Sequence, residues 1–163
     1  MKFTPNVFAL SLYPLFLTIS YLVAQPSLRQ TLLFLGSFSF QSAVLDWIFL
    51  FTANPVIGKW AARYTLFVAL VWMIYLGGKE TTALEWWFNS ILHYFFPAIT
   101  IIAYLPYRSR PVRSSVYGRI YPIVYLVFIV LLELKIGYLI YPILRDNPFF
   151  MAALWTACLI VFD

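Results

Sequence analysis

Apolar residues fill this sequence in six stretches, each long or nearly long enough to cross a lipid bilayer as a helix. In hydrocarbon the backbone must satisfy its own hydrogen bonds, and α-helices do so within one segment. We expect spans at 7–23, 28–51, 62–76, 84–105, 116–134 and 149–162. The connections are short, so the sequence predicts an all-α, polytopic integral membrane protein: one six-helix bundle that forms a single domain over 1–163. The first run resembles a signal peptide after Lys2, but Tyr13, Pro14 and the lack of a small-residue cleavage site favour a helix.

The composition excludes several classes of protein. With 63% hydrophobic residues and a mean hydropathy of +0.86, the chain has too little polar surface to cover a water-soluble globule. Cys158 is the only cysteine and His93 the only histidine, which argues against a disulfide framework and a thiol-rich metal site. We therefore expect no metal and no organic cofactor.

The basic residues predict the orientation. With a cytoplasmic N-terminus, seven fall on the inner side and four on the outer side, which favours both termini inside. The inner set is Lys2, Lys59, Arg63, Arg108, Arg110, Arg113 and Arg119, and the outer set is Arg29, Lys79, Lys135 and Arg145. Four of the inner residues lie in the loop 106–119, which is expected to attract anionic lipid headgroups at roughly 1 kcal/mol per residue. No nucleic-acid partner is expected, because other motifs of nucleic-acid recognition are missing from the sequence.

Polar side chains inside the spans are the candidate functional residues, because ionisable groups there are costly and face the bundle interior or a water-filled cavity. Two are ionisable: Asp46 in the second span and His93 in the fourth. Smaller polar groups accompany them, namely Ser37, Ser39, Gln41 and Ser42 in the second span and Asn89 and Ser90 in the fourth.

Counting along the spans predicts that Ser39 and His93 lie at one depth. Ser39 comes 11 residues after Leu28 and His93 nine after Leu84. At about 1.5 Å per residue, both lie roughly 13 to 17 Å from the outer ends of their helices. A hydroxyl and an imidazole at one level permit a pair of nucleophile and base. Asn89, one helical turn before His93, is expected to orient the ring or to stabilise an oxyanion.

Asp46 lies seven residues beyond Ser39, about 10 Å deeper on the same face, too far to join this pair. We expect Asp46, Gln41 and Ser42 to make polar contacts inside the bundle, with Arg63 or a tyrosine hydroxyl as candidate partners of the carboxyl group.

The polar residues of the second and fourth spans also have a purely structural interpretation. Membrane helices use Ser, Asn and Gln for interhelical hydrogen bonds, and His93 can simply bind a carbonyl across the bundle.

Several motifs resemble those of a known family. They are Asn89-x-x-x-His93 followed by Pro97, the loop Tyr107-Arg108-Ser109-Arg110, Tyr121-Pro122-x-x-Tyr125, and Tyr141-Pro142-Ile143-Leu144. In this order they resemble the bacterial six-helix membrane proteins related to the animal androgen-induced and androgen-dependent transmembrane proteins. The animal members hydrolyse fatty acid esters of hydroxy fatty acids with an intramembrane threonine and histidine. The resemblance covers roughly residues 34–148 and implies a bacterial inner (plasma) membrane.

The second span carries a weaker part of the resemblance. Phe38-Ser39-Phe40-Gln41-Ser42 is similar to the family signature aromatic-Phe-Thr-x-Gln-Ser-Asn, with Ser39 at the threonine position, and His93 matches the family histidine. The chain departs from the family where Ala43 replaces the asparagine and Ser90 stands at the second histidine of the animal proteins.

The residues and the resemblance together predict an intramembrane hydrolase of lipid-like esters. Ser39 would attack the ester carbonyl, and His93 would take its proton and return it to the leaving alcohol. One alternative is a non-catalytic lipid or small-molecule carrier, in which Pro14, Pro97 and Pro122 mark broken helices. The other is a structural subunit of a membrane complex, whose many aromatic side chains pack against protein partners.

Overall fold

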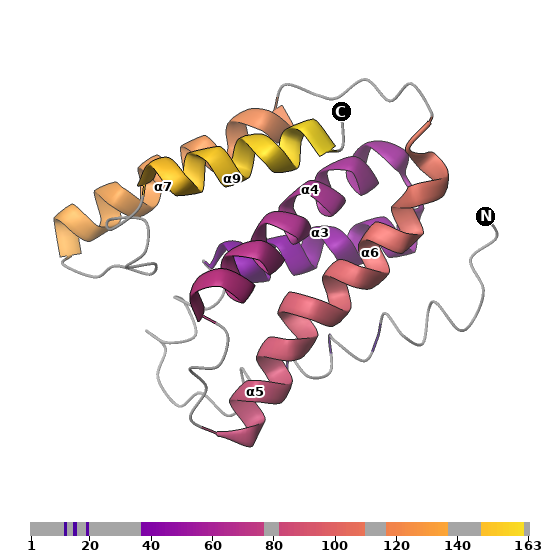
Figure 1. The fold of residues 1–163 in the computed structure, drawn as a ribbon, viewed down its shortest axis with the longest axis horizontal. Helices are drawn as coiled ribbons and strands as arrows, with labels where there is room; N and C mark the ends of the chain where they lie inside the picture. The colour runs from indigo at the N-terminus through magenta and orange to yellow at the C-terminus, as the bar shows by residue number, and fades with distance from the viewer. Residues whose placement is uncertain are drawn as a thin grey trace.

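The computed structural model describes residues 37–76, 82–109, 117–136 and 148–161, together with the helical positions Leu12, Leu15 and Ile19. The described ranges contain no strand, so the all-α prediction is confirmed (Figure 1). The helices are α3 (Phe38–Thr52), α4 (Pro55–Val71), α5 (Ala83–Ser90), α6 (Phe96–Tyr104), α7 (Tyr117–Ile136) and α9 (Pro148–Val161). Three short segments extend them: the π-helical η1 (Trp72–Leu76) and η2 (Ile91–Phe95), and the 3₁₀ turn η3 (Leu105–Tyr107).

Two helical stretches, Pro55–Ile74 and Trp86–Tyr107, are long and apolar enough to cross a membrane. Phe38–Thr52 and Phe149–Val161 are shorter apolar helices. The helical residues of the last three expected spans agree with the structure to within two residues at each end. The expected span at 7–23 lies outside the described residues, apart from the three isolated helical positions.

The helix expected at 28–51 is not continuous: residues 28–36 lie outside the described residues, and α3 begins at Phe38. Ser37 has an extended backbone, and its hydroxyl accepts a hydrogen bond from the Phe40 amide at 3.2 Å, so it is the N-cap of α3. A serine in this position ends any continuous helix from residue 28. Ser39 is consequently in the first turn of α3, and the depth argument that counted 11 residues along one helix is wrong.

The helix expected at 62–76 begins earlier than predicted, at Pro55. The Asn54 side chain caps it by accepting from the Val56 and Ile57 amides, and proline suits the first helical position because its missing N–H is not needed there. Lys59, expected outside the span, and Arg63, expected at its inner end, are therefore both well inside α4. Both side chains are buried, and Arg63 is 0% exposed.

Helix α4 is the centre of the bundle and packs against α3, α6 and α9 (Figure 1). Glycines permit two of its close approaches. A Cβ atom on Gly58 would overlap the ring of Phe49 on α3, and one on Gly118 of α7 would overlap the indole of Trp60. The Tyr64 hydroxyl also donates a buried hydrogen bond of 2.7 Å to the Gly118 carbonyl, which fixes the start of α7 against α4.

We expect Gly58→Ala to destabilise the protein by about 1 to 2 kcal/mol. Alanine gains up to about 1 kcal/mol of helix propensity over glycine, but forcing a methyl group against the buried Phe49 ring costs about 1 to 3 kcal/mol. Unfolding in detergent micelles measures the difference. The double variant Gly58→Ala/Phe49→Leu should recover part of the loss relative to the sum of the single variants; strict additivity would contradict the packing explanation.

Candidate functional site

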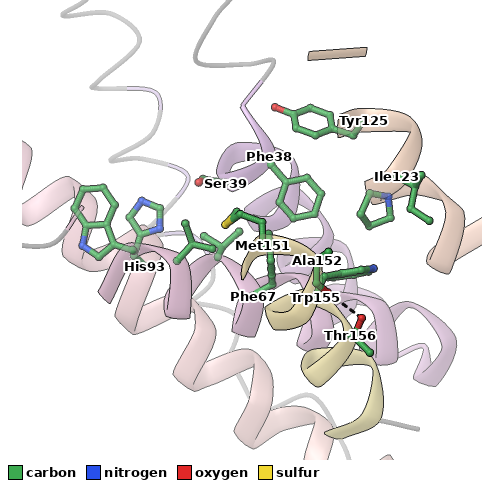
Figure 2. Close-up of a pocket in the computed structure, with 14 residues that line it drawn as sticks. Phe38, Ser39, Phe67, His93, Ile123, Tyr125, Met151, Ala152, Trp155 and Thr156 are labelled. Atoms are coloured by element: carbon green, nitrogen blue, oxygen red, sulfur yellow. Dashed lines mark hydrogen bonds between the residues drawn. The ribbon is translucent and has the colours of Figure 1, made fainter. Parts of the chain in front are cut away.

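A cavity of about 270 Å³ lies between α3, α4, α7, α9 and the π-helical segments (Figure 2). Its walls are mainly aromatic and aliphatic, and few polar side chains reach it. The lining residues are Phe38, Ser39, Phe67, Val68, Val71, Trp72, His93, Pro122, Ile123, Tyr125, Met151, Ala152, Trp155 and Thr156. A concave, mostly apolar pocket with a few polar groups is the usual form of a small-molecule site.

Ser39 and His93 both line this cavity, so the structure brings the two expected residues to one site. Ser39 comes from the first turn of α3, and its hydroxyl points to the side of the cavity on which the His93 ring lies (Figure 2). His93 is only 5% exposed, and its Nδ1 atom has no hydrogen-bond partner among the described residues. The two side chains therefore line one cavity, and His93 makes no hydrogen bond through Nδ1 to any described residue.

The backbone at His93 is π-helical because of Pro97. Proline has no N–H to donate to the carbonyl four residues earlier, which is that of His93, and its ring would clash with that carbonyl. The Phe96 amide instead donates to the Ile91 carbonyl, five residues back. Such π-turns inside helices frequently occur at functional sites. Pro97 thus sets the local helical register that carries the imidazole.

Trp72 holds the His93 ring in place by stacking. The two ring centroids are 4.2 Å apart and the planes differ by 4°. Trp72 is the first residue of η1 and His93 lies in the middle of η2, so two π-helical segments meet at this pair. A stacked indole covers one face of the imidazole and leaves its edge for other contacts.

The other expected site residues lie elsewhere. Asn89 is half-buried on α5 and does not line the cavity. Gln41, on α3, accepts a hydrogen bond from the Tyr121 hydroxyl of α7 through its Oε1 atom. Asn89 is thus outside the cavity that Ser39 and His93 line. Gln41 links α3 to α7 through its hydrogen bond.

Asp46 and Ser42 are buried inside the bundle, as expected, but away from this cavity. The hydroxyls of Thr65 on α4 and Thr100 on α6 lie beside the Asp46 carboxyl group. Neither Asp46 oxygen makes a hydrogen bond of ordinary geometry with any described residue, so the expected contact with Arg63 or a tyrosine hydroxyl is not formed there.

Sequence reasoning missed several residues of the site. No sequence motif marks Trp72, because its stacking on His93 depends on how two helical segments pack together. The α9 wall, with Met151, Trp155 and Thr156, carries only an apolar pattern in the sequence. Thr65 and Thr100, which lie beside Asp46 and outside the cavity, could have been singled out as polar residues within expected spans. No three His, Cys, Asp or Glu side chains come together in the part of the chain that the structure describes.

We expect Trp72→Leu to make His93 more reactive toward diethyl pyrocarbonate. An aromatic pair contributes about 0.5 to 1.5 kcal/mol beyond burial, so losing the stack should speed modification by up to about tenfold. His93 is the only histidine, so the modification reports on one residue. Trp87→Leu, which changes an indole that is 59% exposed, is the matched control. Equal rates in wild type and Trp72→Leu would show that the stack does not protect the ring.

No protein-family model, curated protein or solved structure matches this chain.

Proposed function

We propose that the protein is an intramembrane hydrolase of lipid-like esters, with Ser39 as nucleophile and His93 as general base. The observation that carries the proposal is that these two side chains line the same cavity. In this proposal the helices form a six-span bundle in a bacterial inner membrane, with both termini in the cytoplasm and Arg108 and Arg119 near anionic headgroups. The family resemblance of the sequence motifs supports the same reading.

The distribution of polarity supports a membrane location. Asp46, Arg63 and Thr100 are 0% exposed, while large apolar side chains cover much of the outside, including Leu84 and Ile102 at more than 60% exposure. In water, the buried polar groups and the exposed apolar side chains would both cost free energy. In a bilayer, apolar side chains face lipid and the rare ionisable groups face the bundle interior.

The proposed reaction is acyl transfer to serine followed by hydrolysis. His93 takes the proton of the Ser39 hydroxyl as its oxygen bonds to the ester carbonyl carbon, and then gives that proton to the leaving alcohol oxygen as the ester bond breaks. Water attacks the acyl-serine in a second step, again with His93 as base, and releases the fatty acid. The missing hydrogen bond through Nδ1 is compatible with this scheme, because catalytic contacts are often loose without substrate.

The position of Ser39 supports a source of oxyanion stabilisation other than Asn89. Ser39 is the second residue of α3, and first-turn amides have no partner within their own helix. The positive end of the helix dipole lies at the same place. In our proposal, the Ser39 amide faces the oxyanion that forms on the carbonyl bonded to its own hydroxyl.

The apolar walls support a substrate with a hydrocarbon chain. Phe67, Val68 and Ile123 offer no hydrogen bond to a polar substrate, so affinity would come from burial of methylene groups, at about 0.8 kcal/mol each. The ester group would then lie at the Ser39 and His93 end of the cavity. Lipid-like esters combine these two features.

A carrier is the second candidate function. It is favoured by the same apolar walls together with the absence of a hydrogen bond at His93 Nδ1, because a binding cavity needs no nucleophile and base. In a carrier, Ser39 and His93 would only contact the polar end of the bound molecule.

A fluorophosphonate probe separates the two functions, because it forms a covalent bond only with an activated hydroxyl. We expect wild type to be labelled, Ser39→Ala to lose labelling and hydrolysis, and His93→Ala to slow both by at least about 100-fold, the usual contribution of a general base. Ser39→Thr should keep part of the activity, because it retains a hydroxyl.

Thr156→Val is the matched control for this experiment. Thr156 lines the same cavity, but its hydroxyl donates to the Ala152 carbonyl at 2.8 Å (Figure 2). Labelling of this variant should equal that of wild type. Retained turnover in both Ser39→Ala and His93→Ala would reject the hydrolase, and substrate flux through liposomes without labelling would favour the carrier.

We expect Ala152→Leu to shorten the acyl chain that the enzyme accepts. Ala152 lines the cavity, so a larger side chain displaces part of the bound hydrocarbon. Loss of two buried methylenes lowers kcat/KM for a long-chain ester by about tenfold, while a short-chain ester is unaffected. Ala153→Leu, at the next and exposed position of α9, is the control. An equal loss for both chain lengths would contradict an acyl-binding role.

A further inference from the structure

A second group of polar side chains lies in the interior, separate from the cavity. Ser42 and Asp46 of α3, Thr65 of α4 and Thr100 of α6 are all at most 2% exposed. The three helices pack against one another, and the Thr65 and Thr100 hydroxyls lie beside the Asp46 carboxyl group. Ser42 is one turn before Asp46 on the same helix face. We call these four residues the Asp46 cluster.

Four of the five side-chain oxygens of the Asp46 cluster lack a hydrogen-bond partner among the described residues. Both carboxyl oxygens of Asp46, the Ser42 hydroxyl and the Thr100 hydroxyl are buried without a hydrogen bond to any described residue. A buried polar atom without a partner costs about 1 to 3 kcal/mol, and an isolated charge costs more. The Thr100 hydroxyl lies beside the carboxyl group without a hydrogen bond to it, as oxygen atoms do when they surround a common ion.

We infer that the Asp46 cluster binds one sodium ion. All its donors are oxygen atoms, two from the carboxylate and three from hydroxyls, and hard cations prefer such ligands. The single negative charge of Asp46 balances a monovalent ion, whereas a divalent ion would leave excess charge in an apolar bundle. Intramembrane ionisable residues commonly mark ion sites. The inference does not depend on the hydrolase proposal, because no residue of the Asp46 cluster lines the cavity.

The buried basic residues of α4 do not contact the Asp46 carboxyl group through a hydrogen bond. Lys59 and Arg63 are both on α4, but neither is hydrogen-bonded to Asp46, since neither carboxyl oxygen has a partner. The four members of the cluster thus supply donors from three helices around one charge. Sodium would hold α3, α4 and α6 together at this point.

Binding of radioactive sodium to the full chain in phospholipid nanodiscs tests the inference directly. We expect saturable binding of one ion per chain, displaced by unlabelled sodium but not by choline at equal ionic strength. Sodium should also raise the unfolding temperature relative to choline by about 3 °C or more at saturating concentration. Absence of saturable binding in wild type would overturn the inference and leave a protonated Asp46 as the explanation.

Variants of the Asp46 cluster test whether its oxygens bind the sodium ion. Asp46→Asn should abolish sodium binding and the sodium-dependent stabilisation, and Thr100→Val should weaken binding by about tenfold or more. Thr156→Val removes a hydroxyl outside the cluster and should bind sodium as wild type does, as should Ser39→Ala. If Asp46→Asn does not fold, Thr100→Val decides; unchanged affinity in Thr100→Val or in a folded Asp46→Asn overturns the inference.

Discussion

The contact between the Phe49 ring and Gly58 lets α3 and α4 approach closely, and the remaining architecture depends on this pair of helices. Only Ala53 and Asn54 separate them, and Ala53 takes the left-handed conformation that ends α3. The pair supplies Ser39 to the cavity near one end and Asp46 and Thr65 to the interior. Two further helices pack against the pair: α6 contacts both members, and α9 contacts α4.

Much of the fold could be predicted from the sequence, because long apolar runs leave a chain few alternatives. The ends of α7 and α9 agreed closely with the expected spans. The starts of α3 and α4 did not, since hydropathy ignores caps: Ser37 and Asn54 decide where these helices begin, whatever the polarity of their neighbours. The same error left Lys59 outside the expected helix and put Arg63 at its start, although both are residues of α4 with buried side chains.

Two residues of the candidate site could be predicted from the sequence, but the arrangement of the site could not. Ser39 and His93 stood out as polar residues in apolar spans, and both line the cavity, although the depth argument that paired them was wrong. Their roles as nucleophile and base stay a prediction. Helix periodicity assumes one register throughout, so it could not foresee that Pro97 introduces a π-turn or that Trp72 stacks on the imidazole. Asn89 was chosen on that assumption and does not reach the cavity.

The buried charges of α4 bear on how such a bundle is assembled. In the proposed membrane location, a lysine or arginine costs about 2.5 to 3.5 kcal/mol at the centre of an inserting helix, and Arg63 lies in the middle of α4 with Lys59 one turn before it. The two-residue connection joins α4 directly to α3, which is rich in apolar side chains. In that location, the two helices would enter the bilayer together as a hairpin. The short turn would then serve biogenesis as much as the finished structure.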